Sequence, residues 1–317
     1  MRCDVSEHPK RTLILLATYN GGQYLRAQLD SFLAQTNDQW DLLVSDDGSS
    51  DDTLEILTGF KAQVSGRHEV TLLPGPQKGC AQNFLSLIRH VPEGTGFLMF
   101  SDQDDVWLPE KIARAQAVLA REGAQHQPVL YAAGSLVSNE SLTQSVKSPA
   151  LRRAPSFGNA LVQSIGGGNT MMLNGAATAL LRAAAEDVDT IVVHDWWAYQ
   201  VISGCGGKVI REQSHLLYYR QHGGNVIGAN SSVRGKLYRL AFVAGRQFAQ
   251  WNDTNIKALT ASSHRLTPEA REALFQYGEA RNGGVLHRLR ALWKSGAARQ
   301  TWKGTAALYL ACIARKL

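Results

Sequence analysis

The sequence lacks the features that define disulfide-rich domains and membrane spans. Its four cysteines, Cys3, Cys80, Cys205 and Cys312, are far apart and form no CxxC pair. This spacing fits neither a zinc site nor a disulfide framework, and it favours reduced thiols in a cytosolic protein. No apolar run approaches the roughly 20 residues that span a bilayer. The polar start, residues 1–12, has no apolar stretch of the kind found in a secretory signal.

Acidic residues are scarce in the last third of the chain. Residues 226–317 contain 15 Lys and Arg against 4 Asp and Glu, whereas residues 1–225 contain 18 against 23. A basic segment of this kind indicates an anionic partner (membrane lipid, nucleic acid or an anionic substrate) or else solvated basic helix faces. We therefore expect a catalytic body over residues 1–225 and a basic helical extension over residues 226–317.

The body alternates apolar runs with segments of helical spacing. Runs that end in turn residues predict buried parallel strands, with helices between them. The predicted strands are Thr12–Ala17, Trp40–Ser45, Val70–Leu73 and Gly96–Phe100, and the predicted helices begin near Tyr24, Asp52, Ala81 and Pro109. Further along we expect helices over 175–186 and 194–203, and edge strands over 208–211 and 216–219. The pattern predicts an α/β fold with a mostly parallel sheet covered on both faces.

Polar clusters follow three of these strands, at Thr18–Asn20, Asp46–Ser49 and Asp102–Asp105. In such sheets ligands bind outside the carboxyl ends of the strands, so the three clusters are expected to share one crevice. The Asp46–Ser49 cluster can accept hydrogen bonds from a base and a ribose, or it is an ordinary strand-to-helix turn. Tyr19 offers a ring that can stack on a base, or it is a core residue.

The acidic cluster indicates a cation site. Asp102, Asp104 and Asp105 repel one another unless a cation lies between them. Their hard oxygen atoms suit Mg²⁺ or Mn²⁺, and a substrate diphosphate can complete the coordination shell. The alternative is a solvated helix N-terminus, where Asp is common.

Together these clusters resemble the inverting family 2 glycosyltransferases with the GT-A fold, over about residues 11–225. The resemblance rests on Ala17-Thr18-Tyr19-Asn20, residues 44–53, Lys78-Gly79 with Asn83, and residues 100–107. The later motifs His194-Asp195-Trp196-Trp197 and Tyr218–Asn225 resemble the rhamnosyltransferase-like branch of that family.

The resemblance implies roles for individual residues. The donor would be bound by Thr18, Tyr19, Asn20, Asp46, Asp47, Lys78, Asn83, Asp102 and Arg220. The metal, Mg²⁺ or Mn²⁺, would be held by Asp102, Asp104 and His222. We expect Trp107, Gly168, Asn169 and Trp196 to contact the acceptor. From its residues, the stretch 166–169 is interpreted either as backbone that approaches the acceptor or the donor sugar, or as a plain flexible loop.

Asp195 lies where the family places its general base. That base removes the proton of the acceptor hydroxyl as the hydroxyl attacks the anomeric carbon. Many members carry Glu-Asp at this point, whereas this chain has His194-Asp195. The alternative role for Asp195 is a helix N-cap.

The resemblance therefore implies metal-dependent transfer of a sugar, such as L-rhamnose, from a dTDP- or UDP-linked donor. The acceptor would be a glycan or lipid-linked glycan in bacterial surface polysaccharide synthesis. We expect a cytoplasmic enzyme, peripheral at the inner face of the membrane, with no nucleic-acid partner. In residues 281–317, Trp293 and Trp302 stand among Lys and Arg residues, which suits a membrane interface. The alternative is that the apolar residues of this segment pack on the body.

Two other function classes fit less well. A nucleotidyltransferase also uses paired Asp and Mg²⁺, but it needs a basic glycine-rich phosphate loop, and Thr18–Gly22 has no basic residue. A membrane- or glycan-binding protein on a decayed transferase scaffold would not need the acidic cluster and Asp195, which are both intact.

Overall fold

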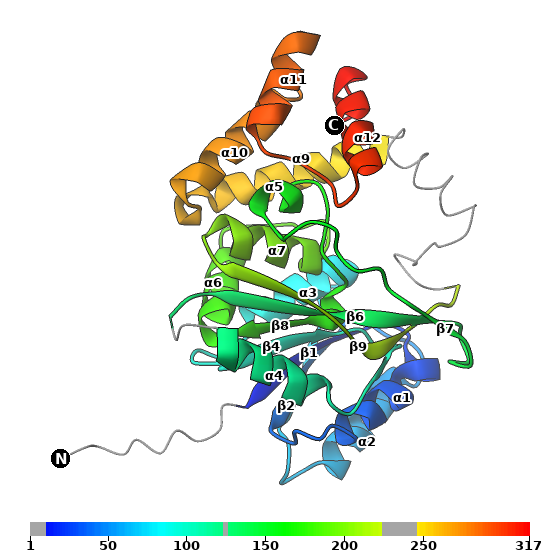
Figure 1. Cartoon of the computed structure of the whole chain (residues 1–317). Helices are drawn as coiled ribbons and strands as arrows, with labels where there is room; N and C mark the ends of the chain where they lie inside the picture. The colour runs from blue at the N-terminus through cyan, green and yellow to red at the C-terminus, as the bar shows by residue number, and fades with distance from the viewer. Residues whose placement is uncertain (1–10, 123–125, 224–245) are drawn as a thin grey trace, which may run out of the picture.

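A computed structural model describes residues 11–122, 126–223 and 246–317 (Figure 1). Cys3, residues 1–10 of the polar N-terminal stretch, Gly224, Asn225 and the expected boundary at 225/226 lie outside these residues. The first half contains β1 (Thr12–Thr18), α1 (Gly22–Leu33), β2 (Trp40–Asp46), α2 (Thr53–Gln63), β3 (Val70–Pro74), α3 (Cys80–Arg89), β4 (Phe97–Ser101), β5 (Val106–Trp107) and α4 (Lys111–Glu122). These elements confirm the strands and helices predicted there.

The second half begins with a long strand that the sequence pattern did not predict. It contains β6 (Val129–Ser138), β7 (Ser145–Lys147), α5 (Phe157–Ala160), the short 3₁₀ helix η1 (Gly168–Thr170), β8 (Met171–Asn174), α6 (Gly175–Ala185), α7 (His194–Gly204) and β9 (Lys208–Arg220). The described C-terminal elements are α9 (Arg246–Ala261), η2 (Ser263–Arg265), α10 (Pro268–Glu279), α11 (Val285–Lys294) and α12 (Trp302–Ile313).

One mixed sheet runs through the body in the order β3-β2-β1-β4-β8-β6-β9-β5, with β7 paired to β6. The strands β3, β2, β1 and β4 are parallel, so their carboxyl ends lie at one edge of the sheet. The prediction of two edge strands at 208–211 and 216–219 was wrong. Both segments belong to one strand, β9, which lies between β6 and β5. The register between β6 and β9 is irregular around Gly134. This irregularity explains why the sequence pattern predicted two separate strands instead of one.

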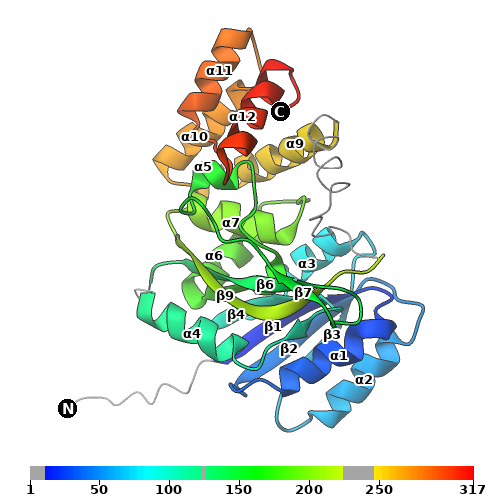
Figure 2. The same ribbon diagram turned by 45° about the vertical axis from the view of Figure 1, so that its right-hand side comes forward.

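The sheet is covered on both faces, as Figure 2 shows. Successive residues of a strand point to opposite faces, so Ile14 and Leu16 enter one core while Leu15 enters the other. The first core packs under α1, α2 and α4, and the second packs under α3, α6 and α7. This two-sided burial is the reason that β1 is a continuous apolar run.

The C-terminal helices α9 to α12 stack on the end of the body formed by α5 and α7 (Figures 1 and 2). Their own core includes Leu161 and Val162 from the segment after α5. Asn159 donates a hydrogen bond to the carbonyl of Ala298 at 2.8 Å, and the rings of Trp196 and Trp251 lie 6.2 Å apart. Among the helices of the described ranges, none is both long and apolar enough to cross a bilayer.

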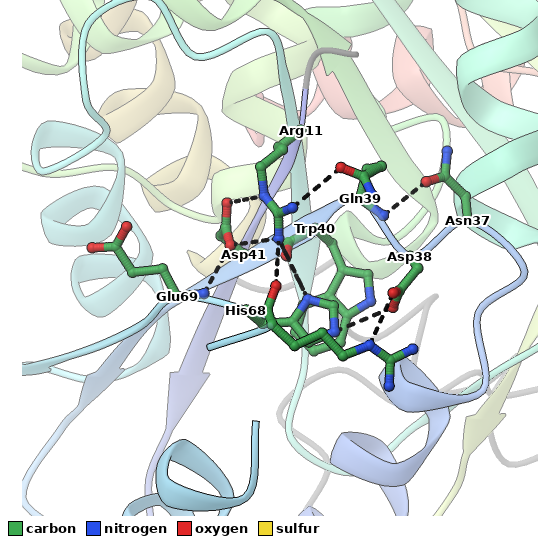
Figure 3. A network of polar contacts seen from close by, with 9 residues as sticks. Arg11, Asn37, Asp38, Gln39, Trp40, Asp41, His68 and Glu69 are labelled. Atoms are coloured by element: carbon green, nitrogen blue, oxygen red, sulfur yellow. Dashed lines mark hydrogen bonds and ion pairs between the residues drawn. The ribbon is translucent and has the colours of Figure 1, made fainter. Parts of the chain in front are cut away.

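A polar network joins the amino ends of β1, β2 and β3 (Figure 3). Arg11 Nε lies 2.6 Å from Asp41 Oδ2, and its Nη2 donates to Asp41 Oδ1 at 2.8 Å. His68 stacks on Trp40 with ring centroids 3.5 Å apart. These contacts link the starts of three neighbouring strands.

Candidate active site

Asp46 organises the turn after β2. Its carboxylate accepts hydrogen bonds from Thr18 Oγ1 at 2.9 Å, from the backbone N–H groups of Gly48 and Ser49, and from Ser49 Oγ at 2.6 Å. Gly48 has φ +94°, a conformation that glycine adopts without strain. Thr18 and Asp46 are buried. They therefore join the end of β1 to the turn after β2.

Asp47 shapes the neighbouring loop in the same way. Its two carboxylate oxygens accept hydrogen bonds from the backbone N–H groups of Gln77 at 2.6 Å and Gly79 at 2.7 Å. Lys78 lies between them and is exposed, so its ammonium group is available to a phosphate. This loop-holding role of Asp47 was not predicted from the sequence.

Tyr19 presents its ring to solvent, with 58 % of the residue exposed. Its backbone is held from both sides by the side-chain amide of Gln103. The Tyr19 N–H donates to Gln103 Oε1 at 2.8 Å, and Gln103 Nε2 donates to the Tyr19 carbonyl at 3.0 Å. The next residue, Asn20, has φ 46° and accepts a hydrogen bond from the Ser50 N–H at 2.8 Å. The exposed ring on a fixed backbone is suited to stacking on a base.

The acidic cluster concentrates negative charge. Burial, followed by the nearby carboxylates of Asp104 and Asp195, raises the pKa of Asp102 to about 8. Burial, followed by Asp102 and Asp104, also raises the pKa of Asp105 well above its usual range. A divalent cation beside Asp102 and Asp104 would relieve this repulsion.

Asp105 has a structural role within the cluster. It is fully buried, its Oδ2 accepts a hydrogen bond from Asn169 Nδ2, and its Oδ1 accepts one from the Arg220 N–H at 3.2 Å. Asn169 is itself buried. It therefore fixes the acidic loop instead of contacting an acceptor directly, which corrects its expected role.

The side chain of His222 contacts the carboxylate of Asp104. Its Nε2 lies 2.7 Å from Asp104 Oδ2. In the described ranges, no three His, Cys, Asp or Glu side chains converge as a ready set of metal ligands, so the expected trio of Asp102, Asp104 and His222 is not preassembled. The carboxylates of Asp102 and Asp104 are still suitable ligands for Mg²⁺ or Mn²⁺. Mg²⁺ is commonly held by one or two carboxylates together with substrate phosphates and water.

Arg220 links the acidic cluster to a neighbouring pocket. It is 7 % exposed, its Nε donates to the Asp104 carbonyl at 2.8 Å, and its Nη1 donates to the Glu140 carbonyl. The guanidinium lies over the Tyr24 ring at 4.8 Å, and that ring lies 4.7 Å from the His222 ring. The pocket has a volume of about 560 Å³ and is lined by Gln23, Tyr24, Ala27, Asn139, Glu140, Ser141 and Arg220. Tyr24 and Glu140 were not predicted as site residues.

Asp195 lies in the first turn of α7, whose N-cap is Val193, so the helix-cap alternative does not hold. Its Oδ2 accepts a hydrogen bond from the Gly168 N–H at 3.1 Å. Burial raises the pKa of Asp195 to about 7, partly offset by the N–H groups of Trp196 and Gly168. A carboxylate with a pKa near the working pH is suited to act as a general base.

His194 packs behind Asp195 as an uncharged ring. It stacks on Phe84 with centroids 3.7 Å apart and meets Phe100 edge-on at 4.9 Å. Burial lowers the pKa of His194 to about 3. A Cβ on Gly168 would lie well inside contact distance of the His194 ring, so only glycine lets this backbone approach. The glycine therefore supports Asp195 through its N–H group and its lack of a side chain.

Three other expected site residues lie in the interior. Trp107 is 2 % exposed and packs edge-on against Phe32, which corrects its acceptor role. Trp196 is 6 % exposed and donates its Nε1 hydrogen to the Ala160 carbonyl at 2.6 Å, so it joins α7 to α5. Asn83 is 1 % exposed and donates to the Ser45 carbonyl at 2.8 Å, which holds α3 against β2 instead of contacting the donor.

Comparisons with known proteins agree with this geometry. Relative to dTDP-rhamnosyl transferase RfbG from Shigella flexneri, the chain is 28 % identical over 243 residues, covering 74 % of this chain and 80 % of that protein. The structure is similar to that of Staphylococcus aureus TarS 1-349 in complex with UDP-GlcNAc, with a TM-score of 0.56 and 15 % identity, covering 96 % of this chain and 88 % of that one.

A second solved structure has the same fold. It is the mannosyltransferase PcManGT from Pyrobaculum calidifontis in complex with GDP-Man and Mn²⁺, with a TM-score of 0.50 and 16 % identity, covering 97 % of this chain and 87 % of that one. Residues 13–189 match the family model described as Glycosyl transferase family 2. The chain thus belongs to glycosyltransferase family 2 and is an enzyme with the GT-A type of fold.

Proposed function

We propose that the protein is an inverting, metal-dependent glycosyltransferase that moves L-rhamnose from dTDP-L-rhamnose to a glycan or lipid-linked glycan. The observation that carries the proposal is that Asp195, a half-buried carboxylate with a raised pKa, lies close enough to Asp102 for its charge to raise the pKa of that residue. The relative named as a dTDP-rhamnosyl transferase supports the choice of donor.

In the proposed reaction the acceptor hydroxyl oxygen attacks the anomeric carbon of the donor. The bond from that carbon to the diphosphate oxygen breaks, and the nucleoside diphosphate leaves with the electron pair. Asp195 takes the hydroxyl proton, and a single displacement inverts the anomeric configuration. Proton transfer to a positioned base contributes roughly 10²–10⁴ in rate.

The remaining residues bind and orient the donor. The exposed ring of Tyr19 stacks on the base, and the turns held by Asp46 and Asp47 enclose the nucleoside. Asp102 and Asp104 would hold Mg²⁺ or Mn²⁺, which when bound offsets the charge that develops on the leaving diphosphate. Lys78 and Arg220 are proposed to add positive charge at the diphosphate, which would stabilise the leaving group electrostatically.

The proposed acceptor indicates where in the cell the enzyme would work. A lipid-linked glycan is held at a membrane surface, so we propose that the protein works at the inner face of the bacterial cytoplasmic membrane as a peripheral enzyme. Its participation in surface polysaccharide synthesis follows from the same acceptor class.

Donor choice can be tested by calorimetric titration of dTDP, UDP and GDP in the presence of Mn²⁺, followed by turnover of the matching nucleotide sugars. The proposal predicts the tightest binding for dTDP and turnover of dTDP-L-rhamnose. Tightest binding of UDP or GDP, with turnover of the corresponding sugar nucleotide, would keep the transferase but reject the rhamnosyl donor.

A further inference from the structure

The C-terminal helices expose an unusual amount of apolar surface. Seven of the ten exposed large hydrophobic side chains in the described ranges lie between residues 275 and 313. The most exposed of them on α11 and α12 are Leu286 at 84 %, Trp293 at 72 %, Trp302 at 69 % and Leu310 at 66 %. We call Leu286, Trp293, Trp302, Leu310 and Ile313 the apolar outer face. Isolated exposed apolar residues are ordinary, but a concentration on two neighbouring helices indicates an interaction surface.

The exposed residues of α12 form a stripe. Trp302, Ala306, Leu310 and Ile313 are spaced by four, four and three residues, which places them on one side of a helix. Leu308, Ala311 and Cys312 on the same helix are buried in the C-terminal core. The helix is thus apolar on two sides, and the core of the protein accounts for only one of them.

The charged residues of the segment that carries this face have a single sign. Residues 281–317 contain eight Lys and Arg and no Asp or Glu. Lys303 Nζ lies 5.6 Å from the centre of the Trp302 ring, and Arg290 stands one turn from both Leu286 and Trp293 on α11. Both Arg290 and Lys303 are exposed. Aromatic and apolar side chains interleaved with basic ones match the boundary between headgroups and acyl chains of an anionic bilayer.

We infer that the apolar outer face of α11 and α12 inserts into the surface of an anionic lipid membrane, with the surrounding Lys and Arg residues on the headgroups. With 12 residues, α12 is about 18 Å long, well short of the roughly 30 Å hydrocarbon core, so it lies along the surface. This inference rests on the proposed function only for its link to a lipid-linked acceptor, because the lipid contact itself needs neither donor nor acceptor.

The tryptophans provide a direct readout of insertion. The chain has seven, of which Trp40, Trp107, Trp196 and Trp197 are buried and Trp251 is half-buried. Only Trp293 and Trp302 are strongly exposed. The full chain is mixed with phosphatidylglycerol vesicles, and with phosphatidylcholine vesicles as the neutral comparison. We expect flotation with the anionic vesicles, a blue shift of the emission, and quenching by lipids brominated in their acyl chains. Binding weakens when NaCl is raised from 0.1 to 0.5 M.

The matched variants separate insertion from nonspecific effects. Trp302→Gln with Leu310→Gln removes two exposed side chains and should weaken binding to the anionic vesicles at least about tenfold, because each buried side chain of this size contributes about that factor. Val146→Gln removes an equally exposed apolar residue on β7 and should leave vesicle binding unchanged. Circular dichroism and thermal melting confirm that both proteins are folded.

The inference is overturned if the full chain does not float with phosphatidylglycerol vesicles, or if the double variant binds as well as Val146→Gln. Light scattering without lipid tests the other occupant, a second copy of this chain. A dimer that the double variant converts to a monomer, together with no vesicle binding, would assign the face to self-association. Because no nucleotide sugar is present, a failure here leaves the transferase proposal intact, and loss of transfer with intact flotation would leave the lipid inference intact.

Discussion

The side-chain amide of Gln103 makes two hydrogen bonds to the backbone of Tyr19, accepting from its N–H at 2.8 Å and donating to its carbonyl at 3.0 Å. The two residues are 84 positions apart in the sequence. This contact joins the loop of the acidic cluster to the loop that presents the exposed ring. The proposed base-binding and metal-binding parts of the crevice are thereby held at a fixed separation.

Gln103→Leu should weaken donor binding while leaving the global fold intact. Two neutral hydrogen bonds of about 0.5–1.5 kcal/mol each are lost, so the dissociation constant for the nucleotide should rise roughly tenfold or more. Calorimetric titration with the nucleoside diphosphate measures this change. Gln276→Leu on α10, which removes a single exposed bond to Glu272, is the control and should bind nucleotide as the wild type does. Equal affinities for the two variants would show that the Gln103 contact does not support the donor site.

Asp195→Asn should lower kcat by about 10²–10⁴ with little change in donor affinity, because the lost carboxylate acts on the acceptor proton. The pH profile gives a second readout. Since burial raises the pKa of Asp195 to about 7, the base is protonated below that pH, and wild-type kcat should fall about tenfold per unit as the pH decreases further. Steady-state kinetics from pH 5 to 9 check both points. A profile that stays flat below pH 7 would remove Asp195 from the role of base.

The same carboxylate should also affect stability. A folded-state pKa above the unfolded value means that ionising Asp195 is less favourable in the folded protein, so stability decreases as the pH rises from about 4 through about 7. Asp195→Asn should therefore melt at a higher temperature than the wild type at pH 8. Below pH 4 both proteins are uncharged at this position, and their melting temperatures should agree. A destabilised variant at pH 8 would contradict this account.

Gly168→Ala should disturb the support of the base. The new Cβ would meet the His194 ring, which is confined between Phe84 and Phe100, so the backbone must shift and the bond to Asp195 is lost. Overpacking of this kind costs about 1–3 kcal/mol of stability, and kcat should fall with it. Gly59→Ala in α2 is the matched control, because a Cβ there meets nothing within 4 Å. It should retain activity and gain up to about 1 kcal/mol of helix stability.

Asp104→Ala should reduce sugar transfer about 10³-fold or more, since loss of the cation removes several kcal/mol of charge stabilisation at the leaving group. The fold should persist, because the buried contacts of the acidic loop are made by Asp105. Titration of Mn²⁺ in the presence of nucleoside diphosphate, with and without the substitution, measures the metal directly. Unchanged metal affinity would exclude Asp104 as a ligand.

The strands could be predicted from the sequence because burial on both faces leaves a direct signature. Ile14, Leu15 and Leu16 are all fully buried, so β1 appears as an apolar run. The polar residues after such runs mark the predicted crevice, which is why Tyr19 could be singled out. Asp195 was identified instead from the family resemblance, because it begins a helix and follows none of these strands. The long strand β6 was missed because its residues are small or polar at several positions, including Gly134 and Ser135.

The predictions for individual side chains were wrong where residues distant in the sequence determine a side chain's surroundings. Trp107 follows the acidic motif, yet pairing of the two-residue β5 with β9 turns it into the core. The bond from the Arg220 N–H to Asp105 spans 115 positions, and that from Gly168 to Asp195 spans 27. The spacing of residues along the chain does not encode these contacts. The sequence also left open whether the C-terminal apolar residues pack or stay exposed. Leu292 and Leu308 pack, while Trp293 and Leu310 are exposed.

We propose that the enzyme transfers a sugar from a nucleotide-diphosphate donor with Asp195 as the base. The most direct test measures release of nucleoside diphosphate from dTDP-L-rhamnose and from UDP- and GDP-sugars by the wild type and by Asp195→Asn. Both are assayed with Mn²⁺, with EDTA, and with bacterial membrane extract as the source of acceptor. We expect metal-dependent, acceptor-stimulated release by the wild type and at least about 100-fold slower release by the variant. Release from no nucleotide sugar, or equal release by the two proteins, would contradict it.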